Sequence, residues 1–479
     1  MSDLWRIKPI ELILKQSDET EHGLKRTLTA FSVTLLGIGA IVGTGIFVLT
    51  GVAAAKYAGP GLIISFIVAG IVSGLAAICY AEFASTIPIS GSAYTYSYAT
   101  LGELIAWIIG WDLILEYAVG AAAVSIGWSG YVVDLFKGAL GITIPKALSV
   151  SPFSGGIINL PAVLIILLVT ALLILGTSES TRVNNVIVII KLAVILFFII
   201  IGFGHVNPAN WTPFLPFGAV GIFNGAAIIF FAYIGFDQIS TSAEECRNPS
   251  KDMPIGIFLS LLICTVLYIS VTAILTGVVS YTKLDVASPV SHALILLGLN
   301  AAGAVISVGA ICGLTTVLIV LLFGQSRIFF SMARDGLLPG FFSRVHPRFR
   351  TPYLSSLLVG IFVALIAGLT PIEVVAELTN IGTLAAFVLV SAAVLILRRT
   401  QPNLRRGYRV PFVPVIPILS IIACFVLIVS LPLVTIIRFI IWLAIGLAIY
   451  FLYSRRSSHL ERGVDEPESS DKMRTVGKV

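Results

Sequence analysis

The chain has 479 residues, of which 57% are hydrophobic and 11% are charged, and its formal net charge is +6. With a mean hydropathy of +1.03, this composition excludes a soluble globular domain, which carries about 25% charged residues, and indicates a polytopic membrane protein. The five cysteines show no paired spacing and the five histidines fall near or beyond span ends. We therefore expect no disulfide framework, no metal site, no cofactor and no histidine proton relay.

Residues 1–30 form a polar N-terminal tail without the apolar core of a cleavable signal, which predicts that the first span itself directs insertion. A membrane span needs about 20 mostly apolar residues. Twelve such stretches follow, and the fold class we predict is an all-α polytopic membrane protein with twelve transmembrane helices. We place these spans at 31–55, 60–83, 103–133, 160–177, 184–205, 219–243, 255–280, 301–326, 353–370, 374–397, 415–432 and 435–453.

The basic residues are distributed unequally between the two sides of this layout. Of the 30 lysines and arginines, 24 fall on the side that holds both termini, five fall on the other side, and Lys191 lies within a span. Positive charge is retained in the cytoplasm, so both termini, including the C-terminal tail at 454–479, are predicted to be cytoplasmic in a multi-pass plasma-membrane protein. The net charge is thus explained by topology, and we expect no nucleic-acid partner.

The first span contains a stretch that is poorly suited to a continuous helix. Residues 36–51 read LGIGAIVGTGIFVLTG and carry five glycines, two of which flank Thr44. Each glycine costs a helix about 1 kcal/mol relative to alanine. In hydrocarbon a helix breaks only where its freed backbone groups are buried in protein or face a wet cavity. The pattern therefore predicts a broken helix at Gly43 to Gly45.

A second weak stretch, IFFAYIGFD at residues 229–237, lies in the sixth span. Interrupted helices at matching places in two halves are typical of a transporter binding site. Because five spans precede the second copy, the spacing predicts an inverted repeat that pairs residues 31–205 with residues 219–397. Residues 415–453 then form two helices outside the repeat. The halves agree in their pattern of spans and not in residue-level identity.

Several motifs resemble one known superfamily of carriers. They are the glycine-broken first span, FFAYIGFD in the sixth span, EECRNPSKDMP after it, SMARDGLLP after the eighth, ELTNIGTLAAF in the tenth, and RVPFVPV at 409–415. Over about residues 5–455 the chain resembles the amino acid–polyamine–organocation superfamily, and most of all the bacterial branch of the cationic amino acid transporter family. The resemblance implies a LeuT-type fold of five plus five inverted helices, with helices 1 and 6 broken and two extra helices.

An amino acid brings a carboxylate and an ammonium group into a low-dielectric cavity, where both need pre-placed partners. Unwinding the first span exposes amide donors for the carboxylate, and breaking the sixth exposes carbonyl acceptors for the ammonium. The resemblance implies the same roles, adds the Ile41 carbonyl, and makes Phe231 an aromatic gate. The alternatives are that the glycines allow close helix packing and that the aromatic ring only packs. The predicted backbone site comprises Ile41, Gly43, Thr44, Gly45, Phe231, Ala232 and Ile234.

Three acidic residues lie within or next to these spans. Asp112 and Glu116 are four residues apart on one face of the third span, and Asp237 follows the second break. An unpaired carboxylate deep in a span is costly. We predict that Glu116 and Asp237 face a cationic substrate side chain or bind it through water, whereas Asp112 can equally lie near the cytoplasmic interface. The alternative is that all three pair with internal polar groups.

Lys191 is the only basic residue placed deep within a span. Its simplest interpretation is an ammonium that extends towards the cytoplasmic interface. The resemblance implies instead that it occupies the place of a bound sodium ion between spans 1 and 8, with Thr315 and Thr316 as hydroxyl partners. A fixed cation there favours proton coupling or facilitated exchange. We assign no chemistry to Glu82, Glu373 or Glu377.

The sequence thus predicts a secondary active transporter that imports cationic or small neutral L-amino acids by alternating access, coupled to protons. An amino acid or polyamine exchanger without net proton coupling is the alternative. A channel would need a continuous polar path, and an enzyme would need a catalytic constellation, and neither is visible in the sequence. The expected partners are the amino acid, protons and membrane lipids. An accessory subunit is left open.

Overall fold

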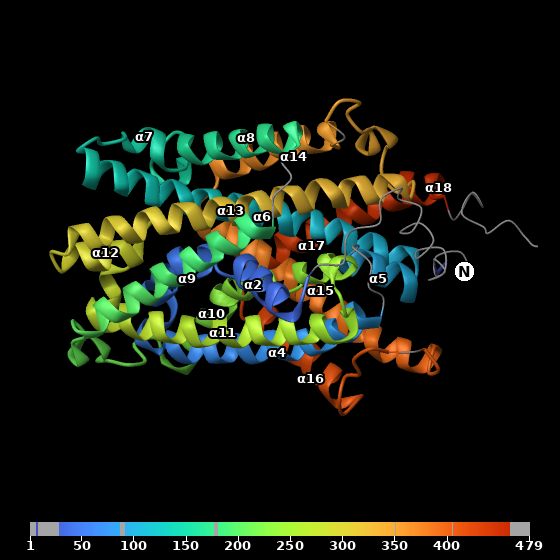
Figure 1. The fold of residues 1–479 in the computed structure, drawn as a ribbon, viewed down its shortest axis with the longest axis horizontal. Coiled ribbons are helices and arrows are strands. Elements are labelled where there is room, and N and C mark those ends of the chain that lie inside the picture. Colours follow the sequence, from blue (N-terminus) through green and yellow to red (C-terminus); the bar gives the residue numbers. More distant parts are fainter. Residues whose placement is uncertain are drawn as a thin grey trace, which may run out of the picture.

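The long helices of the protein run side by side along its longest axis (Figure 1). This computed structural model describes residues 6–7, 28–86, 92–176, 181–349, 351–404 and 406–459. Within them every named element is helical, and one isolated bridge joins Leu28 and Cys246. Helices pair all their interior backbone groups within the segment, as the interior of a bilayer demands. The predicted all-α class is confirmed.

Eight helical stretches in the described residues are long and apolar enough to cross a membrane. They are Gly45–Thr86, Glu103–Gly138, Asn185–Phe203, Gly218–Ser240, Pro249–Val278, Asn300–Arg334, Ile372–Thr400 and Leu433–Ser457. Four shorter apolar helices accompany them, namely α2 (Ala30–Ile41), α8 (Leu160–Leu175), α14 (Tyr353–Leu369) and α16 (Val415–Val429). Each predicted span falls on one or more of these stretches. The chain is a multi-pass membrane protein.

The remaining long helices are α4 (Leu62–Thr86), α6 (Glu103–Leu140), α9 (Thr181–Phe203), α10 (Gly218–Ile229), α11 (Pro249–Val278), α13 (Asn300–Arg334), α15 (Ile372–Thr400) and α17 (Leu433–Ile449). α6 packs along α13 and α15, while α11 packs along α2 and α4. In the most apolar part of α6, 78% of the residues are buried, against 22% in the stretch that contains α17. The core therefore lies around α6, and α17 lies at the periphery.

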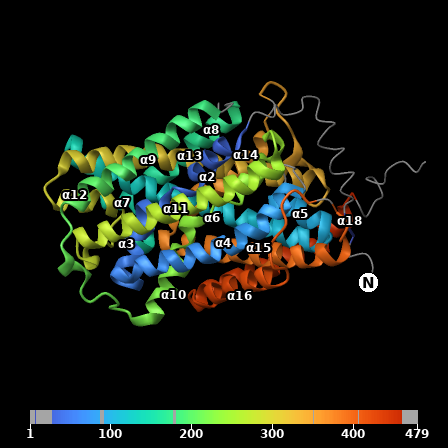
Figure 2. The ribbon, with the colours of Figure 1, turned by 60° about the horizontal axis from the view of Figure 1, so that its bottom comes forward.

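Short helices mark the two ends of the bundle (Figures 1 and 2). α5 (Ser92–Thr100) and α18 (Arg455–Ser457) lie at one end, whereas α7 (Lys146–Ser149) and α12 (Pro289–Leu296) lie at the other. We call them the α5 end and the α12 end. An up-and-down path through successive helices places these connections in this way.

Glu82 organises the α5 end of the bundle. Its Oε2 atom lies 2.7 Å from Arg398 Nη2, and its Oε1 atom lies 3.0 Å from Arg406 Nε. The backbone amide of Val410 also donates to Oε2 at 2.7 Å. Glu82 and Arg406 are buried, so the Arg406 charge is compensated by Glu82, and the Glu82 charge by the two arginines. The cluster holds the segment after α15 against α4.

Candidate functional site

The first predicted break is present. α2 ends at Ile41, and the next residue, Val42, is extended at φ −75° and ψ 101°. The chain resumes a helix at Thr44 and continues as a π-helix, η2 (Gly45–Leu49). The last carbonyls of α2 and the first amides of the following segment have no partner within their own helices. The break therefore frees backbone groups in the middle of the bundle.

The second predicted break is also present. α10 ends at Ile229 and is followed by a 3₁₀ turn, η7 (Phe230–Tyr233). Ile234 is extended and Gly235 has φ +122°, a conformation that side chains disfavour. A second 3₁₀ segment, η8 (Gln238–Glu245), continues the path. The FFAYIGFD motif thus marks a change of backbone direction.

The two breaks lie against each other. A Cβ atom on Gly45 would lie 2.3 Å from the Cα atom of Ala232, and one on Gly235 would lie 2.8 Å from the carbonyl carbon of Ala40. Real Cβ atoms do not approach so closely, so both contacts require glycine. In each case the glycine of one break lies on the backbone of the other.

Tyr268 of α11 joins the two breaks, and the sequence analysis did not identify it. Its buried hydroxyl lies 3.0 Å from the Ile41 carbonyl oxygen and 2.9 Å from the Ala232 carbonyl oxygen. A single hydroxyl proton shared between two carbonyls leaves acceptor capacity on both. The available signal was the one tyrosine of this span, since a buried tyrosine hydroxyl usually finds a hydrogen-bond partner.

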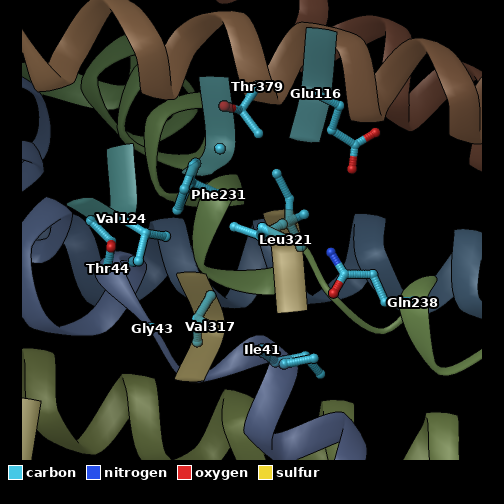
Figure 3. Close-up of a pocket in the computed structure, with 14 residues that line it drawn as sticks. Ile41, Gly43, Thr44, Glu116, Val124, Phe231, Gln238, Val317, Leu321 and Thr379 are labelled. Carbon is cyan, nitrogen blue, oxygen red and sulfur yellow. The ribbon is translucent and has the colours of Figure 1, made fainter. Parts of the chain in front are cut away.

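A small cavity of about 30 Å³ lies beside the crossing of the breaks (Figure 3). Seven of the predicted site residues line it: Ile41, Gly43, Thr44, Gly45, Glu116, Phe231 and Ile234. The lining residues that the sequence analysis missed are Ala40, Gly120, Val124, Gln238, Val317, Leu321 and Thr379. Leu321 lies near the centre of the view, with Thr44 on one side and Glu116 and Gln238 on the other (Figure 3). We call this space the inner cavity.

Ala232 and Asp237 are not among the residues that line the inner cavity. The Ala232 backbone packs on Gly45, and its carbonyl accepts from Tyr268. The Asp237 carboxylate accepts a hydrogen bond from the Gly235 amide at 3.1 Å. Its visible role is to cap the turn at the second break, and the predicted role towards the substrate stays a prediction.

Glu116 and Asp112 lie on the α6 face that packs on Gly382 of α15. Glu116 reaches the inner cavity, and its Oε1 atom has no hydrogen-bond partner among the described residues. Neither carboxylate oxygen of Asp112 has one there, although the residue is buried. Such groups are costly and are retained where a ligand or proton supplies the missing partner.

Lys191 lies behind the first break, outside the inner cavity. Its Nζ atom donates to the carbonyls of Gly39 at 2.9 Å and Val42 at 3.2 Å. The side chain is 1% exposed and its stem packs on Gly313 of α13. An ammonium at the carboxyl end of a helix is favoured by the helix dipole. The lysine thus joins α9 to the first break and to α13.

The two threonines predicted beside Lys191 have other partners. Thr315 Oγ1 accepts from Trp128 Nε1 at 3.0 Å and donates to the carbonyl of Ile311. Thr316 Oγ1 donates to the Gly313 carbonyl within its own helix. Their predicted part in cation coupling stays a prediction. Trp128, which ties α6 to α13, was not singled out from the sequence.

Two helices broken at their crossing, with a cavity beside them deep in a multi-pass bundle, are the features of a membrane carrier. The chain matches the family model described as amino acid permease over residues 28–452. It is 54% identical over 464 residues to the methylthioribose transporter of Bacillus subtilis (strain 168), which covers 96% of this chain and 100% of that protein.

Two further relatives agree with this assignment. The chain is 54% identical over 447 residues to the branched-chain amino acid permease BcaP of the same organism, covering 92% of this chain and 96% of that protein. It is 40% identical over 400 residues to cationic amino acid transporter 4 of Homo sapiens, covering 82% of this chain and 62% of that protein. The chain belongs to the amino acid permease family, so it is a transporter and not an enzyme.

Proposed function

We propose that this protein imports L-amino acids across the plasma membrane by alternating access, coupled to protons. The observation that carries the proposal is the crossing of two broken helices beside the inner cavity. Amides of the first break would receive the substrate carboxylate, and carbonyls of the second would receive its ammonium group. Thr44 would add a hydroxyl, and Phe231 would cover the bound molecule.

The architecture belongs to the same proposal. Twelve spans in a LeuT-type arrangement would form two inverted repeats, 31–205 and 219–397, followed by 415–453 outside them. Both termini would lie in the cytoplasm, which makes the α5 end cytoplasmic and the α12 end external. The 24 to 5 distribution of basic residues supports this orientation. Labelling single cysteines at Ser2 and at the exposed Arg456 with an impermeant reagent tests it, since labelling of both in intact cells overturns it.

The side-chain part of the inner cavity is mostly apolar. Ile41, Val124 and Leu321 line it together with a single carboxylate, that of Glu116. This lining suits neutral apolar amino acids, and Glu116 would serve a cationic side chain. The name of the permease BcaP favours the first group, and the names of the cationic transporters favour the second.

Methylthioribose is a second candidate, because a transporter named for it is as similar to this chain as the branched-chain permease. It has neither a carboxylate nor an ammonium group, so it would not use the amides of the first break and the carbonyls of the second in the way an amino acid would. A thermal-shift screen of the twenty amino acids and methylthioribose on the purified protein separates the candidates, since only ligands of the folded state raise the melting temperature.

Counterflow in proteoliposomes tests the transport cycle. A carrier accelerates uptake of a labelled substrate when the same substrate is present inside, whereas a channel does not. Dependence on an imposed proton gradient then separates coupled import from the alternative, an amino acid or polyamine exchanger without net proton coupling. Absence of both trans-stimulation and ligand-induced stabilisation with every compound would overturn the proposed function.

A further inference from the structure

The helices α15 and α16 pack along each other and are joined at the α5 end of the protein. The Ser391 hydroxyl of α15 donates to the Ser420 hydroxyl of α16 at 2.9 Å, which fixes the two helices side by side. α15 ends at Thr400 and α16 begins at Val415, so residues 401–414 connect them. α16 lies at the edge of the bundle (Figures 1 and 2). The surface at this junction is therefore open to molecules around the protein.

A stripe of exposed apolar side chains runs along α16. It consists of Val415, Ile418, Leu419, Ile422, Phe425, Val426 and Val429. These positions recur every three or four residues, which is the spacing of one helical face. In a multi-pass membrane protein such a face meets the hydrocarbon of the bilayer. The start of α16 therefore marks the depth at which the hydrocarbon gives way to lipid headgroups.

Phe412 comes directly before this stripe and is held in an unfavourable conformation. It is 79% exposed, and its φ of +49° is the one positive φ among the described residues other than glycine. Its carbonyl accepts from the Val415 amide at 2.7 Å, which places it at the start of α16. An exposed apolar ring on a strained backbone costs free energy in water on both counts. An apolar partner outside the protein would offset that cost.

The segment that carries Phe412 is fixed to α4 on its inner side. The Val410 amide donates to Glu82 at 2.7 Å, and the Tyr408 amide donates to the Ser85 hydroxyl at 2.9 Å. Both acceptors lie in the last turns of α4. These bonds hold the backbone just before Phe412, so the ring is presented outwards by an anchored segment.

Positive charge is in excess beside this segment. Glu82 pairs with both Arg398 and Arg406, so two guanidinium groups face one carboxylate. Burial lowers the pKa of the Arg406 guanidinium, and Glu82 opposes this shift. The positive charges of Arg398 and Arg409 lower the pKa further, which shows that all three arginines act on one another. A negative group at this junction would be bound favourably.

Two further guanidinium groups are exposed where the apolar surface ends. Arg399 follows the exposed Ile396 by three residues, so on α15 it lies one turn beyond a lipid-facing side chain. Arg409 is exposed three residues before Phe412. Within the described part of the chain, neither Arg399 nor Arg409 has an ion pair or a side-chain hydrogen bond. Both charges are thus available to a ligand at the depth of the headgroups.

We propose that Arg399, Arg409 and Phe412 form a binding site for the headgroup of an anionic phospholipid. The two guanidinium groups bind the phosphate, and the Phe412 ring lies against the upper part of an acyl chain, continuous with the stripe on α16. The excess positive charge disfavours the cationic end of a zwitterionic headgroup, so an anionic lipid is preferred. In the proposed orientation this is the cytoplasmic leaflet, whose anionic lipids attract clustered arginines. The bound lipid holds the junction of α15 and α16 in place.

Thermal unfolding in nanodiscs of defined composition tests the site. The wild type should melt at a higher temperature in an equal mixture of phosphatidylcholine and phosphatidylglycerol than in phosphatidylcholine alone, because a ligand of the folded state stabilises it. Arg399→Gln and Arg409→Gln should each lose about half of this difference, and the double variant most of it. Arg344→Gln is the matched control, since Arg344 is an exposed arginine in the connection between α13 and α14. It should keep the full difference.

Titration of the detergent-solubilised protein with a fluorescent phosphatidylglycerol measures affinity. Each arginine near an anionic surface contributes about fivefold, so each Gln variant should bind about fivefold more weakly. Phe412→Gly accepts the positive φ without strain, so it should fold at least as well as the wild type. It should nevertheless bind the lipid about three- to tenfold more weakly, because the ring is gone. Phe412→Trp should restore the affinity.

The source of the bound anion is settled by titrating inorganic phosphate and glycerol phosphate in place of the lipid. If either one stabilises the wild type as phosphatidylglycerol does, the site binds a free anion and the lipid assignment is overturned. A wild type with one melting temperature in both lipid compositions also overturns the inference. So does an equal loss in Arg344→Gln, which would reduce the effect to net charge.

The charge-preserving variant Arg399→Lys with Arg409→Lys should keep most of the lipid-dependent difference. It keeps the test decisive if the Gln variants are unstable, because its loss of the difference at wild-type stability in phosphatidylcholine contradicts a role for positive charge at these positions. None of these measurements uses an amino acid. A protein that neither binds nor transports amino acids would therefore overturn the proposed function and leave the lipid site standing.

Discussion

The break after α2 and the break after η7 both free backbone groups inside the membrane, but side chains of opposite charge cap them. At the first break a cation, Lys191, takes the carbonyls of Gly39 and Val42. At the second an anion, Asp237, takes the amide of Gly235. The first cap thus holds two carbonyls, and the second holds one amide.

The two caps therefore occupy different backbone groups: hydrogen-bond acceptors at the first break and a donor at the second. An unwound peptide segment presents amides and carbonyls together, and such a mixture does not select a zwitterion. With two of its carbonyls held by the ammonium, the first break has fewer free acceptors beside its amides, which suit a carboxylate, while the Ile41 carbonyl keeps acceptor capacity beside Tyr268. With an amide held by the carboxylate, the second presents mainly carbonyls, which suit an ammonium. The caps thus hold opposite kinds of backbone group, and neither capping side chain lines the inner cavity.

The largest expected effect comes from Gly45→Ala, which breaks the contact between the two breaks. The new Cβ would meet the Ala232 backbone at 2.3 Å, and backbone cannot move aside cheaply. Overpacking of this kind costs about 1–3 kcal/mol, so amino acid binding should fall about 10- to 100-fold and the melting temperature should fall with it.

Gly43→Ala is the matched control for that variant. Its Cβ would lie 3.4 Å from Val317 Cγ2, an ordinary van der Waals distance. Binding should remain within about threefold of the wild type, since no overpacking arises. Equal losses in the two variants, measured by ligand titration in the thermal-shift assay, would mean that the contact with Ala232 does not matter.

Lys191→Ala removes the positive cap and should have the next largest effect. Hydrogen bonds to a charged group are each worth about 1.5–3 kcal/mol, and two carbonyls would lose theirs. Uptake driven by an inward proton gradient should be lost, while substrate binding is retained within about threefold because the inner cavity is not altered.

Uptake into proteoliposomes with and without a pH gradient, in wild type and variant, measures this effect. A variant that responds to the gradient as the wild type does would reduce Lys191 to an anchor for α9. A wild type that ignores both proton and sodium gradients would favour facilitated exchange, with Lys191 as a fixed substitute for a bound cation.

Glu116→Gln sharpens the comparison by asking which carboxylate faces the substrate. Glu116 reaches the inner cavity, so arginine binding should weaken about tenfold and alanine binding less than threefold. Asp237→Asn is the matched variant, because its side-chain oxygen still accepts from Gly235. It should affect arginine and alanine equally. If Asp237→Asn weakens arginine binding more than alanine binding, Asp237 faces the substrate after all.

Both breaks were predictable because glycines weaken a helix inside an apolar span, and the second weak stretch together with the family resemblance favoured a break over close helix packing. The helices were predictable for a similar reason, since span length follows from bilayer thickness. The partners of the freed groups were not. Tyr268 and Trp128 lie on other spans, and nothing in their own segments indicates which carbonyl or hydroxyl they meet.

The acidic residues Asp112, Glu116 and Asp237 also show what the sequence can and cannot predict. Spacing placed Glu116 and Asp112 on one face, which is correct, and Gly382 fits that face. Proximity to the second break suggested that Asp237 faces the substrate, but a carboxylate two residues after a glycine with positive φ can also turn back to cap its amide. Sequence distance does not separate these geometries, because they differ only in side-chain direction.

Thr44→Val should have the smallest effect, and its two parts have opposite signs. The Thr44 hydroxyl is buried beside the inner cavity without a hydrogen-bond partner among the described residues. Replacing it with an isosteric methyl group removes an unsatisfied polar group, so the substrate-free protein should gain up to about 1 kcal/mol. Amino acid binding should weaken about three- to tenfold, because the hydroxyl no longer donates to the carboxylate.

Thr50→Val is the control, since the Thr50 hydroxyl already donates to the carbonyls of Gly45 and Ile46. That variant should lose about 1 kcal/mol of stability without ligand. Melting temperatures of both variants, with and without substrate, decide the point: a destabilised Thr44→Val with wild-type affinity would assign this hydroxyl to the fold and remove it from the carboxylate site.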